Sequence, residues 1–258
     1  LNTLESKKKI YYWSPCLVNI ATVKAVINSA YSLNKFGKIF ESSIINFFGE
    51  FEKCSAEIKQ KNINLINYFN VKLINLLPKH GKLSSRFSFI IIFILGFFPL
   101  AKILKKKQPD YLIIHLITSL PLILLIFFNF KTKFILRISG YPKMNFFRKI
   151  IWKLAFKKIY AITCPTKLTQ EYILNLNIID KSKVYLLFDP IIEVKKKKDI
   201  KSESIVENNF FLSVGRLTKQ KNFIFLCRCF KKLIDDNKLN LKLFIAGEGE
   251  QKRLLSSY

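Results

Sequence analysis

The sequence predicts an α/β protein with two domains, the second of them incomplete. Short apolar segments of strand length alternate with amphipathic segments of helical period over residues 1–192, which indicates a doubly wound parallel sheet covered by helices. Residues 193–209 carry mixed charge without apolar periodicity, which is typical of a linker. A strand–helix–strand pattern then starts at Phe210 and indicates a further βαβ unit within residues 210–258.

The predicted strands of the first domain are short apolar runs, as expected of strands that are buried on both faces. They are Ile10–Trp13, Ile44–Phe48, Ile63–Phe69, Tyr111–Leu116, Lys133–Ile138, Ala161–Cys164 and Val184–Phe188. The predicted helices repeat apolar residues at helical spacing. They are Thr22–Phe36, Phe51–Gln60, Asn145–Tyr160 and Thr166–Leu174.

The most apolar part of the chain lies between residues 87 and 128. Phe87–Leu104 is interrupted by Gly96 and Pro99 and reaches a lysine in fewer than the about 20 residues that a spanning helix needs. Tyr111–Phe128 is almost as apolar but contains several polar residues and a proline. One interpretation is two transmembrane helices. We favour a surface or buried helix, then a strand, then a helix capped by Thr118 or Ser119.

The βαβ unit has a cationic turn at the end of its first strand. Phe210–Val214 reads as a strand, Asn222–Leu233 as a helix and Leu241–Ala246 as a second strand. Gly215 ends the first strand, and Arg216, Lys219 and Lys221 lie in the turn that follows it. A helix N-terminus offers unpaired N–H groups and a partial positive charge, so this turn predicts a ligand that carries phosphate. The alternative is that the basic residues only solvate a loop.

The residues SVGRLTKQKNF, followed by a helix and FIAGEGE, resemble the start of the donor domain of retaining glycosyltransferases of family 4 (glycosyl transferases group 1). These enzymes have two Rossmann-like domains in the GT-B arrangement. The resemblance is specific over residues 210–250 and weaker, but in the same order, over the rest. It implies that Arg216 and Lys221, with Gly215 in the turn, hold the diphosphate of a nucleotide-sugar donor. The Glu-x7-Glu motif of the family has no counterpart before Tyr258, so we expect the chain to be a fragment.

The resemblance also implies an acceptor side at the strand ends of the first domain. Ser14 opens the loop after the first strand, which is often glycine-rich in the family and has no glycine here. Ser139 and Gly140 follow the strand at whose end the family often carries a His. Arg137 lies at the same edge and could face the acceptor or pair with a carboxylate. His115 ends the preceding strand and is the catalytic candidate, although a lone His is more often structural.

Asn145–Tyr160 predicts a basic amphipathic helix. Its apolar side comprises Phe147, Ile150, Ile151, Leu154 and Ile159. Lys149, Lys153 and Lys157 line another side, and we expect Trp152 between the two. Helices of this kind lie in the interface of anionic bilayers, but an ordinary helix that covers a sheet has the same pattern. The resemblance favours the membrane, because many such enzymes act on lipid-linked acceptors, and predicts a cytoplasmic protein peripheral to the inner face of the cell membrane.

Composition indicates an anionic partner. The chain has 44 basic and 17 acidic residues, a net charge of +27, although the codons of an AT-rich genome also favour Lys. A nucleic-acid-binding protein would need a recognition motif, and the strands are too apolar for an RNA-binding sheet. The cysteines are Cys16, Cys54, Cys164, Cys227 and Cys229, without a CxxC pair. Neither a disulfide framework nor a metal site is therefore predicted.

The resemblance thus implies a metal-independent transferase without a cofactor, and the sequence offers no acidic metal-binding pair such as Asp-x-Asp. It would move a sugar from a nucleotide-sugar donor to the hydroxyl of a saccharide or lipid-linked acceptor, with retention, in cell-envelope polysaccharide or glycolipid synthesis. The alternatives are an inactive membrane-binding fragment or pseudo-enzyme, a basic nucleic-acid-binding protein and an integral membrane protein.

Overall fold

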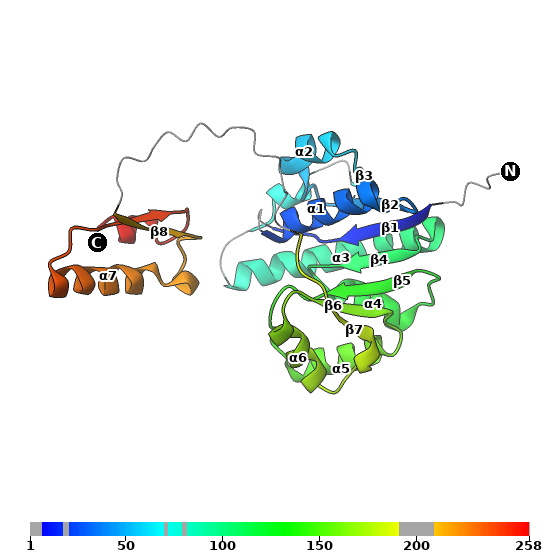
Figure 1. Cartoon of the computed structure of the whole chain (residues 1–258). Coiled ribbons are helices and arrows are strands. Elements are labelled where there is room, and N and C mark those ends of the chain that lie inside the picture. The colour runs from blue at the N-terminus through cyan, green and yellow to red at the C-terminus, as the bar shows by residue number, and fades with distance from the viewer. Residues whose placement is uncertain (1–6, 18–20, 70–71, 79–81, 191–208, 258) are drawn as a thin grey trace. The chain divides into compact units, whose positions relative to one another are not determined.

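The chain divides into two units, Leu1–Val194 and Lys195–Tyr258, which are described separately. The computed structural model describes residues 7–17, 21–69, 72–78, 82–190 and 209–257 (Figure 1). Apart from Asn209, the predicted linker at residues 193–209 lies outside the described residues.

The first unit is built on a seven-stranded sheet in the order β3-β2-β1-β4-β5-β6-β7. All its neighbouring strands are parallel, as the alternation of apolar strands and helices predicts. The strands are β1 (Lys8–Trp13), β2 (Phe40–Asn46), β3 (Asn64–Asn67), β4 (Tyr111–Ile114), β5 (Lys133–Arg137), β6 (Ala161–Cys164) and β7 (Val184–Leu186). The strand order reverses between β1 and β4, and ligands of such sheets bind outside the carboxyl ends of the strands at that point.

Helices cover both faces of this sheet (Figure 1). Alternate β1 residues divide between two cores: Ile10 and Tyr12 pack with α1 and α2, whereas Tyr11 and Trp13 pack with the helices of the other face. The helices of the first unit are α1 (Ala21–Phe36), α2 (Ser55–Gln60), α3 (Lys82–Lys107), α4 (Ser119–Phe127), α5 (Phe146–Phe156) and α6 (Lys167–Asn175). Because alternate side chains of a strand point to opposite faces, each strand contributes residues to a core on each side of the sheet.

α3 is one continuous helix across the stretch that the sequence shows as interrupted. It contains Pro99, and Gly96 lets it approach the sheet: a Cβ at Gly96 would lie 3.1–3.3 Å from Leu120, Phe48 and Trp13. By length and composition α3 is the one helix of the described part that could cross a membrane, over Arg86–Lys107. It nevertheless packs its inner side into the core of this unit.

The segment after α3 folds as the strand and helix that we favoured. β4 occupies Tyr111–Ile114 and α4 begins at Ser119. The predicted cap is wrong in detail, because Thr118 is the N-cap residue but its side chain makes no capping hydrogen bond. Pro121 lies in the first turn of α4 and is buried, where its missing N–H removes no helical bond.

Several element boundaries differ from prediction, among them those of β2 and of the helix that follows it. β2 begins at Phe40 and ends at Asn46, so its first half includes Ser42. The Ser42 N–H donates to Asn34 Oδ1 (2.7 Å) and its hydroxyl to the Ala30 carbonyl (2.7 Å), so α1 provides partners that apolar pattern alone does not show. The predicted helix Phe51–Gln60 divides into a 3₁₀ turn at Glu52–Cys54 and α2.

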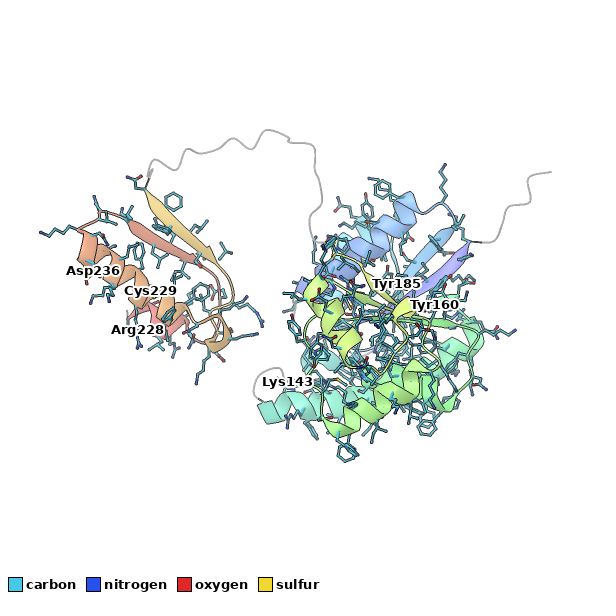
Figure 2. The ribbon with its side chains drawn as sticks, turned by 60° about the horizontal axis from the view of Figure 1, so that its bottom comes forward. Lys143, Tyr160, Tyr185, Arg228, Cys229 and Asp236 are labelled. Carbon is cyan, nitrogen blue, oxygen red and sulfur yellow. The ribbon has the colours of Figure 1, made fainter. Side chains whose placement is uncertain are left out.

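The second unit is the predicted βαβ unit. It consists of β8 (Phe210–Val214), α7 (Phe223–Asn237), the parallel strand β9 (Lys242–Ala246) and α8 (Lys252–Ser256). α7 packs on the two strands, and Phe211 and Phe230 meet edge to face with ring centroids 5.8 Å apart. Figure 2 shows Arg228, Cys229 and Asp236 on α7, and all three are exposed.

Candidate functional site

A cavity of about 760 Å³ lies at the carboxyl ends of the central strands of the first unit. It is lined from the loops after β1, β4 and β5 and from α3 and α5. The lining residues are Pro15, Cys16, Leu17, Phe89, His115, Leu116, Ile117, Thr118, Ser119, Arg137, Ile138, Ser139, Gly140, Tyr141, Pro142, Asn145, Phe147, Arg148, Ile151 and Trp152. The cavity thus occupies the point where the strand order reverses, which is where the fold places a ligand.

His115 reaches this cavity in a buried position. It is 7% exposed, and its backbone N–H donates to the Trp13 carbonyl (2.9 Å), which fixes the start of the loop after β4. Burial, with a smaller contribution from the positive charge of Arg137, lowers the pKa of His115 to about 3. The imidazole is therefore neutral near pH 7 and can accept or donate a hydrogen bond, but it cannot act as a protonated general acid at that pH.

Arg137 lines the cavity but is already paired. Its Nε and NH2 donate to Asp189 Oδ1 at 3.1 and 2.5 Å, and NH1 donates to the Leu187 carbonyl. Arg137 is 4% exposed, so the pair satisfies a charge that would be costly to bury alone. Of the two predicted roles for Arg137, the structure shows pairing with a carboxylate.

The other predicted acceptor-side residues divide. Ser139 and Gly140 line the cavity and are exposed, and a Cβ at Gly140 would meet nothing within 4 Å. Ser14 is fully buried and is not among the lining residues. The prediction is wrong for Ser14, because the loop turns its neighbours Pro15 and Cys16 to the cavity instead.

Sequence reasoning missed a buried carboxyl group beside this edge. Glu50 Oε2 accepts a hydrogen bond from the Phe48 N–H (2.8 Å), whereas Oε1 has no partner in the described part of the chain. Burial raises the pKa of Glu50 to about 7. The thiol of Cys16, which lines the cavity, donates to the Glu50 carbonyl at 3.8 Å. The only local signal is the preceding Gly49, whose φ is +79°, the mark of a tight turn.

α5 carries the predicted lysine row, but Trp152 is not on its surface. Lys149, Lys153 and Lys157 are exposed. Trp152 is 4% exposed, lines the cavity and packs on Phe156 with ring centroids 5.1 Å apart. The prediction of an interfacial Trp152 is therefore wrong, because this side chain belongs to the core. The exposed apolar residues of α5 are Phe146, Phe147, Ile150 and Leu154.

The cationic turn of the second unit is braced by a second loop. The Gly215 N–H donates to the Ala246 carbonyl (3.0 Å) and the Leu217 N–H to the Glu248 carbonyl (2.9 Å). A Cβ at Gly247 would lie 1.8 Å from the Gly215 oxygen, and one at Gly249 2.3 Å from the Leu217 oxygen. The glycines of the GEGE sequence are therefore needed for this close approach.

Arg216 and Lys221 project from the braced turn into solvent. Both are exposed, and α7 begins two residues after Lys221, at Phe223. Among the residues that the structure describes, neither side chain forms an ion pair with a carboxylate. The turn thus offers two uncompensated cations beside a helix N-terminus, an arrangement that suits a phosphate group.

Comparison with solved structures shows the GT-B fold. A glycosyltransferase from Rickettsia africae matches with a TM-score of 0.58 and 17% identity, over 94% of this chain and 68% of that chain. TarM matches with a TM-score of 0.65 and 10% identity, over 97% and 73%. A putative UDP-N-acetylglucosamine 2-epimerase from Listeria monocytogenes matches with a TM-score of 0.58 and 12% identity, over 93% and 62%. At these identities the likeness shows the fold alone, which transferases and epimerases share.

Sequence comparison is more specific. Residues 194–258 match the family described as glycosyl transferases group 1. An uncharacterized glycosyltransferase of Methanocaldococcus jannaschii is 32% identical over 249 residues, which cover 86% of this chain and 56% of that protein. The chain therefore spans little more than half the length of this relative.

Proposed function

We propose that the chain takes part in transfer of a sugar from a nucleotide-sugar donor to an acceptor hydroxyl, which is supported by the match of residues 194–258 to the glycosyl transferases group 1 family. The observation that carries the proposal is the pair of exposed cations, Arg216 and Lys221, on the turn that precedes α7; neither has a carboxylate partner among the described residues. A family match and an anion-binding geometry coincide at this turn.

The donor's diphosphate binds to Arg216 and Lys221. The guanidinium of Arg216 can contact two phosphate oxygens at once, and Lys221 supplies a point charge. As the bond to the sugar breaks, negative charge grows on the departing nucleoside diphosphate, and these cations stabilise it. No divalent cation is required for this role, so EDTA is expected to leave turnover unchanged.

The acceptor binds in the cavity of the first unit. Its polar residues, among them His115, Ser139 and Arg148, suit hydroxyl groups, and its aromatic walls suit a sugar ring or the first part of a lipid chain. A neutral His115 can accept a hydrogen bond from an acceptor hydroxyl. Because it carries no charge, it does not compete with Arg216 and Lys221 for the anionic diphosphate. The anomeric configuration is retained in the product.

The reaction takes place at the cytoplasmic surface of an anionic membrane, in the synthesis of a cell-envelope polysaccharide or glycolipid. The exposed Lys149, Lys153 and Lys157 beside exposed apolar residues of α5 support this location. A TarM variant from S. aureus was solved with fondaparinux, α-GlcNAc-glycerol and UDP. The bound UDP in that structure supports a nucleotide sugar as the donor.

Calorimetric titration with UDP, GDP and their sugar conjugates tests the donor site. Arg216→Ala is expected to weaken binding about 10–100-fold, because a charge-assisted hydrogen bond contributes about 1.5–3 kcal/mol. Lys232→Ala, an exposed lysine of α7, is the matched control and should bind like the wild type.

Equal affinity of the Arg216→Ala variant and the wild type for every nucleotide would contradict the assignment. Incubation of the protein with a tight-binding UDP-sugar, first without and then with an added acceptor, distinguishes epimerisation from transfer. A 2-epimerised nucleotide sugar would favour an epimerase, whereas transfer to an added acceptor supports the proposal.

A further inference from the structure

The outer side of α3 carries an exposed apolar stripe. Phe87, Ile90, Ile94 and Phe98 are 59%, 56%, 62% and 77% exposed. Their spacing of three, four and four residues places them on one side of the helix, over about 16 Å at about 1.5 Å per residue. The opposite side is buried, with Ile92, Leu100 and Leu104 at 0–1% exposure. The four side chains of this stripe therefore do not contribute to the core of this unit.

The stripe ends in a lysine-rimmed hollow. A hollow of about 570 Å³ is lined by Tyr68, Phe98, Ala101, Lys102, Lys105, Lys106 and Phe128. Lys105 Nζ lies 4.5 Å from the centre of the Phe128 ring. Within the described part of the chain, none of these lysines is paired with a carboxylate. Apolar surface and uncompensated positive charge thus lie end to end on one helix.

We propose that the outer side of α3 binds the surface of a bilayer that contains anionic phospholipids. The helix lies along the surface, the stripe Phe87–Phe98 is buried at the boundary of the acyl chains, and Lys102, Lys105 and Lys106 contact lipid phosphates beside the aromatic hollow. This inference rests on the membrane location in the proposed function and names α3, rather than α5 alone, as the element that inserts.

Charge favours a bilayer over a second copy of the chain as the occupant. If two copies of α3 packed in parallel, the lysine ends would face each other. If they packed antiparallel, Lys102 and Lys105 would approach the exposed Arg86 of the other copy. Both arrangements bring like charges together, whereas an anionic lipid surface is complementary along the whole helix.

The acceptor cavity opens beside the same helix. Phe89 of α3 and Phe147 of α5 both line that cavity, and both are exposed, at 43% and 74%. Phe89 precedes Gly96 and Leu100 by seven and eleven residues, so it lies on the sheet-facing side of α3. α3 therefore lines the cavity from its inner side and would contact the bilayer with its outer side.

Vesicle co-sedimentation of the whole chain tests the inference. Ile90→Ser/Ile94→Ser is expected to lower partitioning at least 10-fold on vesicles with 30% phosphatidylglycerol. Lys102→Gln/Lys105→Gln/Lys106→Gln should lower it at least 10-fold on the same vesicles and little on pure phosphatidylcholine. Phe36→Ser, at a 71% exposed position of α1, is the matched apolar control and should bind like the wild type.

Insertion can be measured directly by fluorescence. Both native tryptophans are buried, Trp13 at 0% and Trp152 at 4% exposure, so Ile94→Trp adds a single exposed reporter. Brominated lipids should quench it by more than half and leave the wild-type emission nearly unchanged.

Unquenched Ile94→Trp, or equal vesicle binding by the wild type and the Ile90→Ser/Ile94→Ser variant, would overturn the inference. Wild-type dimers that this variant dissociates, without a change in lipid binding, would assign the stripe to a second copy. Nucleotide titration of the same variants separates the two proposals, since loss of lipid binding should leave nucleotide affinity unchanged.

Discussion

Two buried ionisable residues near the cavity have pKa values displaced in opposite directions. The pKa of His115 is lowered to about 3, and that of Glu50 is raised to about 7. Both shifts arise first from burial, which disfavours the charged form of each group. Each residue is therefore neutral in the folded state near neutrality, and each couples stability to pH.

The sign of this coupling differs for the two residues. Between pH 6.5 and about 3 the unfolded chain binds the His115 proton and the folded chain does not, so His115 lowers the free energy of unfolding as pH falls. Between pH 4.5 and about 7 the folded chain holds the Glu50 proton and the unfolded chain does not. Glu50 therefore raises the free energy of unfolding as pH falls. In the shared window the two contributions oppose each other.

Single substitutions should separate them. Relative to the wild type, we expect the free energy of unfolding of His115→Gln to rise as pH falls from 7 to 5 and that of Glu50→Gln to fall, each by at most about 1.4 kcal/mol per pH unit. Urea unfolding followed by tryptophan emission reports the first unit, which contains both tryptophans. Glu171→Gln, at an exposed position of α6, is the control. Parallel pH profiles for all variants would show that neither residue is coupled in this way.

At this scale sequence reasoning located positions better than roles. It placed His115, Arg137 and Ser139 at strand ends, and all three line the cavity, because the ends of parallel strands share one edge. The Asp189 partner of Arg137 and the burial of Glu50 depend on contacts between distant segments, which no local pattern encodes. Trp152 was misplaced because helical period gives the angle around α5 but not which neighbours cover it.

At the scale of elements, α3 shows how one helix can serve both a core and a surface. Its inner side packs against α4 and the sheet, and its outer side is apolar and exposed. The sequence shows only that the helix is apolar all round, which fits a buried helix and a membrane span equally. Strand and helix types were predictable because their periods differ, whereas this distinction depends on the packing around the helix.

Substitution of Gly96 tests that α3 belongs to the core. We expect Gly96→Val to lower the free energy of unfolding by about 1–3 kcal/mol, because Trp13, Phe48 and Leu120 already lie within 3.3 Å of an added Cβ. Urea unfolding measures the loss, and Ile94→Val, two residues away and on the exposed side of the helix, is the control. Stability equal to the wild type would mean that α3 lies farther from the sheet than described.

At the scale of the whole molecule, charge is the dominant feature. A net charge of +27 makes the folded chain repel itself, and added salt screens that repulsion. We therefore expect the urea midpoint to rise as sodium chloride increases from 20 to 300 mM. The contribution of apolar burial to stability changes little over that range, so the rise would report the screening of charge. A midpoint that falls with salt would indicate that ion pairs, such as Arg137 with Asp189, outweigh the net repulsion.

The contact at Gly96 also has a consequence for natural variation. Four positions from separate parts of the chain, Trp13, Phe48, Gly96 and Leu120, share one confined volume, so a gain of size at one requires a loss at another. Among homologous sequences these positions are expected to covary: a larger residue at position 96 should accompany a smaller one at 13, 48 or 120. An alignment of relatives would reveal the spacing between α3 and the sheet as a correlation between columns, without any further structure.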